Sequence, residues 1–166
     1  MTLEKDYYSI FKVENHVEHK ENLINLINKI PKNKYNNISH TDWNLSDQTK
    51  KEWQEYFLNN IYSQWSKFFN KKTKQQIILH NFWFQWYNVG DYHNWHVHTD
   101  THFTNVYYLS LPNPNVKTSI LAFNKEKNIK VKEGQILTFP AFWKHCSPRN
   151  IYFDPKIIIS FNIDLN

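Results

Sequence analysis

The segment Ile77-Ile78-Leu79-His80-Asn81-Phe82-Trp83-Phe84-Gln85-Trp86-Tyr87-Asn88-Val89 marks the point where the chain changes from a helical to a strand-like pattern. It is rich in β-branched and aromatic residues, which favour strands, and it contains no strand-breaking residue before Gly90-Asp91. Further short segments of this kind follow between turn residues, at 93–98, 104–111, 119–123, 129–132, 135–139 and 156–163. This spacing predicts an all-β barrel or sandwich for residues 76–166.

The part before this segment, residues 1–75, has a mainly helical pattern. An apolar face with helical spacing ends at Pro31, a residue that cannot continue a helix, and consists of Leu23, Ile24, Ile27 and Ile30. A second helix, which Ser46 or Asp47 could cap, carries a stripe at intervals of about four, namely Trp53, Phe57, Ile61, Trp65 and Phe68. We interpret this stripe as the face that packs on a sheet. The fold class predicted is therefore mainly β with N-terminal helices packed outside a β-barrel-like body.

Length and composition limit the kinds of protein that this chain can be. A chain of 166 residues predicts one domain, 1–166, and 40% hydrophobic with 21% charged residues excludes wholesale disorder. No apolar run approaches the roughly 18 residues of a membrane span, and the first ten residues do not have the pattern of a signal peptide. A single cysteine, Cys146, excludes an intramolecular disulfide and a Cys-based zinc finger. We therefore expect a cytoplasmic protein without a membrane partner, in the host cytoplasm if the gene belongs to a phage.

The net charge of +5 comes almost entirely from lysine, because Arg149 is the only arginine. This basicity and the seven tryptophans raise the hypothesis of a nucleic-acid binder. Nucleic-acid surfaces, however, usually show clustered Arg and Lys, and the excess of Asn, Lys and Ile is typical of an AT-rich coding genome. The composition therefore disfavours a nucleic-acid partner.

Four of the nine histidines lie within ten residues, in His93-Asn94-Trp95-His96-Val97-His98-Thr99-Asp100-Thr101-His102. Alternate side chains of an extended strand point the same way, so His96, His98 and Asp100 are expected on one side. Such a nitrogen and oxygen donor set suits Fe(II), Mn(II) or Zn(II). A further ligand is expected from His145, which follows a glycine turn and an apolar strand ending at Phe139-Pro140.

These residues form part of an ordered set of blocks from Trp86 to Asn162 that resembles a known family. The blocks are Trp86-Tyr87-Asn88 with Gly90-Asp91-Tyr92, then His96-Val97-His98, then Val106-Tyr107-Tyr108-Leu109 with Pro112, then Glu133-Gly134 through Phe139-Pro140 to His145 and Pro148, and a final strand 156–162. The family is that of the small Fe(II)/2-oxoglutarate-dependent oxygenases of phage and marine-bacterial type, relatives of the prolyl hydroxylases. The resemblance implies a double-stranded β-helix, jelly-roll or cupin-like.

The resemblance also implies roles for individual residues. His96 and His145 are implied iron ligands, and the middle ligand lies in one of two registers, His96-x-His98 or His98-x-Asp100. We favour His96, His98 and His145, with Asp100 as the alternative ligand or as a partner that orients an imidazole.

For the co-substrate 2-oxoglutarate, the resemblance places Lys156 at the position of the carboxylate-binding cation and Tyr108 at that of an assisting tyrosine. Asn88 and Ser160 are further candidates for binding it. The candidate walls of the substrate pocket are Trp86, Asn94, Tyr107, Trp143 and Arg149.

The implied activity is hydroxylation of a C–H bond with release of succinate and CO2, with ascorbate as reductant. The expected substrate is a protein or peptide, with peptidyl proline as the leading candidate for the hydroxylated residue, or a metabolite. The alternative from another class is a metal-binding, cupin-like barrel without oxygenase activity. The N-terminal helices are expected to support the sheet, form a homodimer surface or contact substrate.

Overall fold

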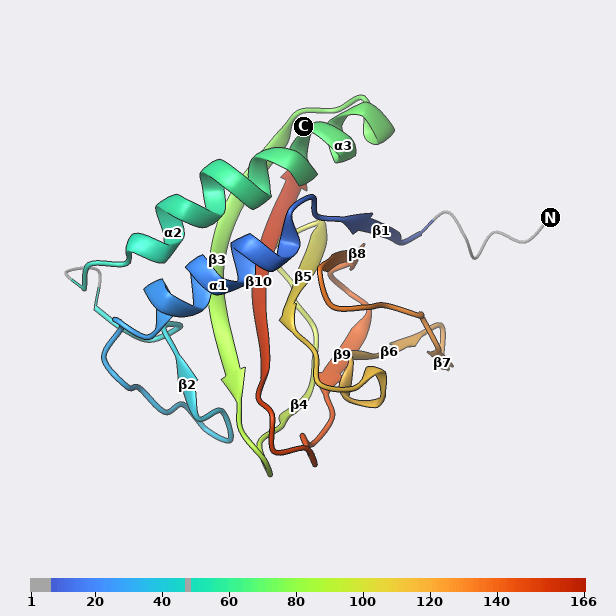
Figure 1. Ribbon diagram of the computed structural model, residues 1–166. Coiled ribbons are helices and arrows are strands. Elements are labelled where there is room, and N and C mark those ends of the chain that lie inside the picture. The colour runs from blue at the N-terminus through green and yellow to red at the C-terminus, as the bar shows by residue number, and fades with distance from the viewer. Residues whose placement is uncertain (1–6, 47–48) are drawn as a thin grey trace.

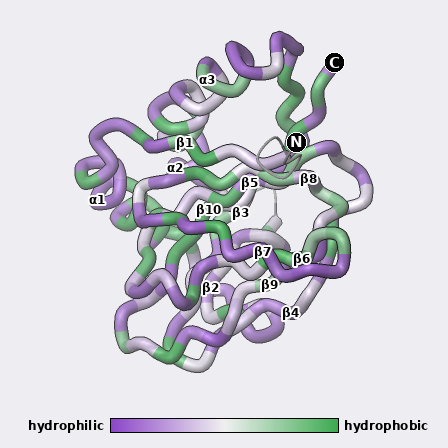
Figure 2. Tube along the Cα trace, turned by 90° about the vertical axis from the view of Figure 1, so that its right-hand side faces the viewer, coloured by the Kyte–Doolittle hydropathy of each residue, from purple (hydrophilic) through white to green (hydrophobic). Residues whose placement is uncertain are grey.

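The computed structural model describes residues 7–46 and 49–166, which build two antiparallel sheets with helices on one side (Figure 1). In the turned view of Figure 2, the helices and the smaller sheet lie on opposite sides of the strands of the larger sheet. The molecule therefore has three layers, and the space between the two sheets is the interior of the β body.

The larger sheet contains six strands in the order β1-β8-β5-β10-β3-β2. Their bounds are Ser9–Lys12 for β1, Gln135–Pro140 for β8, Phe103–Ser110 for β5, Lys156–Leu165 for β10, Ile77–Tyr87 for β3 and His40–Thr41 for β2. Because β10 pairs with β3 on one side and with β5 on the other, strands from the two ends of the β region meet at the centre of this sheet.

The smaller sheet contains four strands in the order β4-β9-β6-β7. Their bounds are His93–His96 for β4, Lys144–Ser147 for β9, Ser119–Ala122 for β6 and Lys125–Lys127 for β7, and a short 3-10 helix at Pro114–Val116 precedes β6. Two facing antiparallel sheets of this kind form a jelly roll, as expected.

The helices cover the outer face of the larger sheet (Figure 1). Helix α1 spans His16–Ile27, and α2 (Glu52–Phe57), a π-helical segment (Leu58–Tyr62) and α3 (Ser63–Thr73) form one continuous rod. Positions four apart drift around an α-helix of 3.6 residues per turn, and the wider π turn counters this drift. The rod therefore buries a complete stripe, which is Trp53, Phe57, Ile61, Trp65 and Phe69. The stripe thus ends at Phe69, and Phe68 is only partly buried.

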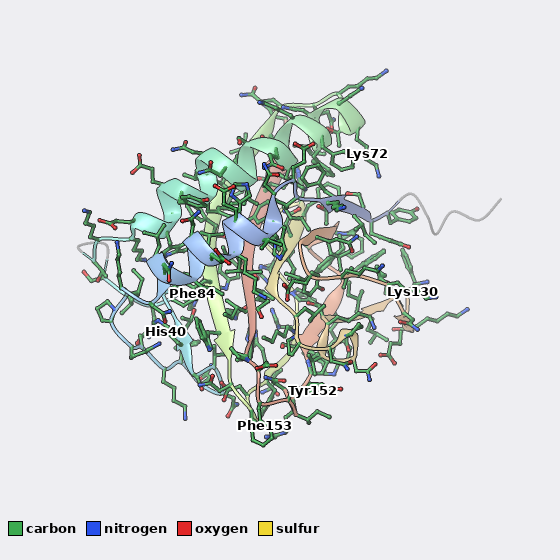
Figure 3. All side chains as sticks on the ribbon, in the orientation of Figure 1. His40, Lys72, Phe84, Lys130, Tyr152 and Phe153 are labelled. Carbon is green, nitrogen blue, oxygen red and sulfur yellow. The ribbon has the colours of Figure 1, made fainter. Side chains whose placement is uncertain are left out.

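Two cores result from the alternation of side chains along the central strands. On β10, Ile157, Ile159 and Phe161 face the helices, whereas Ile158 packs between the two sheets. On β5, Tyr107 belongs to the helix side and Tyr108 to the space between the sheets. Figure 3 shows His40 beside Phe84 on the helix side, with their ring centroids 4.8 Å apart.

Gly134 is required by the turn before β8. Its φ of +81° is unfavourable for other residues, and a Cβ there would lie 2.8 Å from Cγ of His16. The turn is further fixed because the Gly134 N–H donates to the Tyr108 carbonyl and its own carbonyl accepts from Val13 N–H.

The structure differs from the sequence expectations at several short elements. No strand forms at 129–132; β7 lies earlier, and β9, which carries His145, was not predicted. The N-terminal part also adds β1 and β2 to the edges of the larger sheet. The helix expected to be capped by Ser46 or Asp47 begins only at Glu52, and Asp47 lies outside the described residues. Short strands carry too few residues for a clear periodicity.

In the described part of the chain, no helix combines the length and the apolar character that crossing a bilayer requires.

The carboxylate of Asp42 joins the helical layer to the larger sheet. It accepts from the Trp53 indole N–H and from the Phe84 backbone N–H, both at 3.1 Å, and it is buried. We expect Asp42→Ala to lower the free energy of unfolding by about 2–4 kcal/mol, because two buried donors lose their acceptor. Urea denaturation measures this change. The exposed Asp154, changed to Ala, is the control and should shift stability by about 0.5 kcal/mol at most.

Candidate metal and co-substrate site

Three histidines from two neighbouring strands converge at one end of the space between the sheets. His96 on β4 lies opposite His145 on β9 in the antiparallel register. His98 follows β4, and its backbone N–H donates to the Ala141 carbonyl, which turns the segment back toward β9. One ring nitrogen from each of the three residues lies within 4.8 Å of the others. The structure therefore brings together the three residues that the sequence favoured as ligands.

Hydrogen bonds fix the tautomers of two of these rings. His96 Nδ1 lies 2.8 Å from the carbonyl of Asn94, and His145 Nδ1 lies 2.9 Å from the carbonyl of Trp143. A carbonyl oxygen only accepts, so both Nδ1 atoms carry the proton. Nε2 of each ring is left with a free lone pair for a ligand or a metal ion.

Burial keeps the cluster neutral. Burial, and after it the neighbouring His96, lower the pKa of His145 to about 3. Burial also lowers the pKa of His98 to about 4, and that of His96 falls below its usual range for the same reason. At neutral pH the three imidazoles are therefore uncharged, and an uncharged imidazole is the form that can give a lone pair to a metal ion.

Two nearby residues stand outside this trio. Asp100 is exposed in the bend after His98 and is not a member of the converging cluster. Asp100 was expected on the same side as His98, but the strand that would place it there ends at His96. His93 lies opposite Ser147, with its ring centroid 4.2 Å from that of His96. Burial lowers the pKa of His93 to about 4.

An outer cavity of about 470 Å³ opens beside the histidines. Its wall includes aromatic rings, among them Trp83, whose ring is nearly parallel to His98 at 5.9 Å, and the half-exposed Trp43. The remaining wall is largely polar and includes Asn36, Thr41, His80, Asn81, Gln85, Asp100 and Asn162. Such a mixture of aromatic and amide side chains is suited to binding an organic molecule.

An inner pocket lies behind the histidines, between the two sheets. It is lined by Gln85, Tyr87, Thr104, Val106, Thr118, Ser147 and Ser160, besides the imidazoles. The predicted Ser160 is therefore a wall of this pocket. The predicted Tyr108 is buried beside it, and its hydroxyl accepts from the Thr118 N–H, which lines the pocket.

Lys156 is fully buried at the edge of the inner pocket. Its ammonium donates to Ser147 Oγ at 2.8 Å and lies 5.3 Å from the ring centroid of Tyr87. Within the described residues, no carboxylate lies within ion-pair distance of it. Burial lowers the pKa of Lys156 to about 7. The Tyr87 hydroxyl lies near Ser147 but makes no hydrogen bond of good geometry. This end of the pocket thus offers the Lys156 ammonium and the Tyr87 hydroxyl as donors, with no carboxylate of the described residues to pair with the ammonium.

Several predicted pocket residues lie elsewhere. Trp86 and Tyr107 point toward the helices, on the opposite faces of β3 and β5, and the Tyr107 hydroxyl bonds His16 Nδ1 at 2.7 Å. The opposite faces of these two strands, toward the interior, carry Trp83 and Tyr108 instead. Trp143 is buried in the core between the sheets, outside both pockets.

Three other predicted site residues, Asn88, Asn94 and Arg149, are exposed. Asn88 accepts from the Trp86 indole, Asn94 contributes its backbone carbonyl, and Arg149 donates to the Gly90 carbonyl at 2.7 Å. The side chains of Asn88 and Arg149 therefore hold loops, and none of the three residues lines either pocket.

The pocket walls that the sequence interpretation missed come mainly from the other face of the same strands. They include Trp83, Gln85 and Tyr87 on β3, and Asn162 on β10. For β10 the sequence does indicate which face lines the pockets, because polar Ser160 and Asn162 alternate with Ile159, Phe161 and Ile163.

Comparison with family models and with curated proteins finds no match to this sequence. Solved structures do match. An oxidoreductase of the 2OG-Fe(II) oxygenase family from Burkholderia pseudomallei superposes with a TM-score of 0.78 at 9% identity, over 98% of this chain and 86% of that chain. The fold is that of the 2-oxoglutarate-dependent oxygenases.

Prolyl hydroxylases share this oxygenase fold. The viral collagen prolyl hydroxylase of Paramecium Bursaria Chlorella virus-1, in complex with 2OG, has a TM-score of 0.63 at 18% identity and covers 98% of both chains. A prolyl hydroxylase from Trichoplax adhaerens, in complex with a hypoxia inducible factor peptide fragment, has a TM-score of 0.67 at 16% identity, over 98% of this chain and 86% of that one. The expected double-stranded β-helix is therefore confirmed.

The position of Asp100 outside the cluster predicts which substitutions affect metal binding. We expect His145→Ala to weaken Ni(II) binding at least about 100-fold, because one of three ligands is lost, whereas Asp100→Ala binds as the parent does. Isothermal titration calorimetry measures both. Loss of Ni(II) binding in the Asp100 variant alone would place the carboxylate, and not a third imidazole, on the metal.

Proposed function

We propose that this protein is an Fe(II)- and 2-oxoglutarate-dependent dioxygenase that hydroxylates a C–H bond. The observation that carries the proposal is the convergence of three neutral imidazoles beside a buried lysine that has no carboxylate partner among the described residues. The fold of the matching solved structures supports the same assignment.

The residues present fit a divalent metal ion. His96 and His145 direct free Nε2 lone pairs toward the cluster, and their other ring nitrogens are held by backbone carbonyls. In the proposal, His96, His98 and His145 hold Fe(II), a borderline ion for which imidazole is a suitable ligand. Bound Fe(II) with 2-oxoglutarate and O2 supplies the oxidising power, with 2-oxoglutarate converted to succinate and CO2.

The inner pocket, with a volume of about 30 Å³, would take only the distal carboxylate of 2-oxoglutarate. Burying an ammonium group without an anion is costly, and a bound carboxylate would offset that cost. Lys156 would pair with it, and the Ser147 and Tyr87 hydroxyls would supply hydrogen bonds. Ser160 and the Thr118–Tyr108 contact shape the wall around it. Asn88 is exposed and does not line this pocket, so we assign it no part in this role.

The protein's own residues would orient and enclose the substrate. The outer cavity, with Trp83 beside His98, leads to the cluster from the surface. Trp83 and Trp43 present aromatic surface to an apolar substrate group, and Asn81 and Gln85 present amides to its polar part. With the co-substrate carboxylate in the inner pocket and the substrate in the outer cavity, the two molecules would approach the cluster from different sides.

For the substrate we propose a peptide first, with proline as the hydroxylated residue, and a small metabolite second. Support comes from the neighbouring prolyl hydroxylases, one of them in complex with a peptide fragment. Ascorbate is the proposed reductant. That the protein is located in the cytoplasm and forms a homodimer is still a prediction from the sequence.

Measurement of succinate tests the proposal. Protein loaded with Fe(II) should form succinate from 2-oxoglutarate in the presence of ascorbate and O2, first without and then with proline-containing peptides. His145→Ala is the matched control and should form none. A protein that binds metal fully but forms no succinate would instead be a metal-binding barrel without oxygenase activity.

The burial of Lys156 predicts opposite effects on stability and on co-substrate binding. At pH 6, Lys156→Met should raise the free energy of unfolding by about 1–3 kcal/mol, because a buried charge is removed. Urea denaturation measures this change. The same variant should lose 2-oxoglutarate binding. Lys125→Met, at an exposed lysine of β7, should change neither. A variant that is less stable and still binds 2-oxoglutarate would assign Lys156 to the structure alone.

The same group predicts how pH affects co-substrate binding. Because the pKa of Lys156 is about 7 without ligand and the ammonium form binds a carboxylate, affinity should fall as pH rises. We expect the Kd for 2-oxoglutarate to rise roughly tenfold for each pH unit from 7.5 to 9, measured calorimetrically on the Ni(II)-loaded protein. A Kd that is constant over this range would contradict the assignment.

A further inference from the structure

His98 differs from the other two histidines in what holds its second ring nitrogen. Nδ1 of His96 and of His145 faces a backbone carbonyl, whereas Nδ1 of His98 lies 2.9 Å from Nδ2 of Asn162. A carboxamide has an accepting and a donating end, which exchange places when the group rotates by 180°. The tautomer of His98 therefore depends on the rotation of one side chain.

The Asn162 amide belongs to a short hydrogen-bonded chain across three adjacent strands. Asn162 lies on β10, opposite Asn81 on β3 and opposite Thr104 on β5. Its Nδ2 donates to Asn81 Oδ1 at 2.9 Å, and its Oδ1 accepts from Thr104 Oγ1 at 3.0 Å. We call Thr104, Asn162 and Asn81 the amide relay. Asn162 and Thr104 are buried, whereas Asn81 is exposed at the outer cavity and has room to rotate.

In the arrangement observed, the relay holds His98 in the tautomer that does not suit metal binding. Asn162 Nδ2 donates to His98 Nδ1, so the ring proton is on Nε2, the nitrogen that would face a metal ion. Rotation of the Asn162 amide would place Oδ1 against Nδ1, which then carries the proton and frees Nε2. The relay can accommodate this, because Thr104 can accept instead of donating and the Asn81 amide can rotate as well.

We propose that Asn162 selects the ligand nitrogen of His98 and that the amide relay rotates when a divalent metal binds. This inference rests on the proposed metal site. Asn162 acts as a positioning residue, because it would affect the metal only through His98. Its amide contacts Nδ1 of His98, as a backbone carbonyl does for His96 and His145.

The tautomers can be observed directly in the metal-free protein. Long-range ¹H–¹⁵N NMR correlations at pH 8 should show the proton on Nε2 for His98 and on Nδ1 for His96 and His145. In Asn162→Asp, the two carboxylate oxygens only accept, so His98 should carry its proton on Nδ1. A parent protein in which His98 is already protonated on Nδ1 would rule out the rotation.

Metal affinity provides the second readout. Asn162→Leu cannot hold Nδ1 and should weaken Ni(II) binding by about 10–100-fold. Asn162→Asp has the accepting orientation from the start and should bind Ni(II) at least as tightly as the parent. Asn128→Asp, at an exposed loop position, adds the same charge and should leave the Kd unchanged. If the Leu variant does not fold, the Asp variant with its NMR readout still decides the question.

The outcomes separate this inference from the proposed function. Ni(II) binding and succinate formation by the parent, with unchanged Ni(II) affinity in both Asn162 variants, would overturn the role of Asn162 alone. Absence of Ni(II) binding by the parent would overturn both.

Discussion

Strand β10 must satisfy two environments, and the rest of the structure depends on how it does so. It lies between β3 and β5 at the centre of the larger sheet, with helices on one face and the smaller sheet on the other. The face toward the helices is apolar, and the face toward the interior carries Lys156, Ser160 and Asn162. One strand therefore secures the helical layer and supplies polar groups to both ends of the site.

The polar groups of that interior face are costly to bury, and their arrangement is informative for this reason. A buried side chain without a partner lowers stability, so natural cores usually pair such groups within the protein. Here three imidazoles, an ammonium group and a tyrosine hydroxyl converge without an acidic residue among them. This arrangement fits the proposed binding of a cation by the imidazoles and of an anion by the ammonium group.

On β3 and β5, the errors of sequence interpretation at the pocket walls have one cause. Aromatic residues occupy both faces of β3 and β5, because one face packs on helices and the other lines the interior. Trp86 and Tyr107 therefore could not be separated from Trp83 and Tyr108 by residue type. The polar face of β10 was a clearer signal, since only one of its two faces is polar. Asp100 was misplaced because a strand end cannot be located to within two residues from sequence alone.

The sequence by itself determined that helices pack on a β body and, except for its last residue, the helical stripe at intervals of four. Its resemblance to the oxygenase family favoured His96, His98 and His145 as the residues that would meet, with Asp100 as the alternative. Patterns of period two and period four depend on burial of one face, which local sequence records. Only the tertiary structure decided which face of each strand lines the pockets, that Lys156 has no partner in the described chain, and that Asn162 holds His98. Those facts depend on contacts between residues 9 to 81 positions apart, such as Lys156 with Ser147 and Asn162 with Asn81.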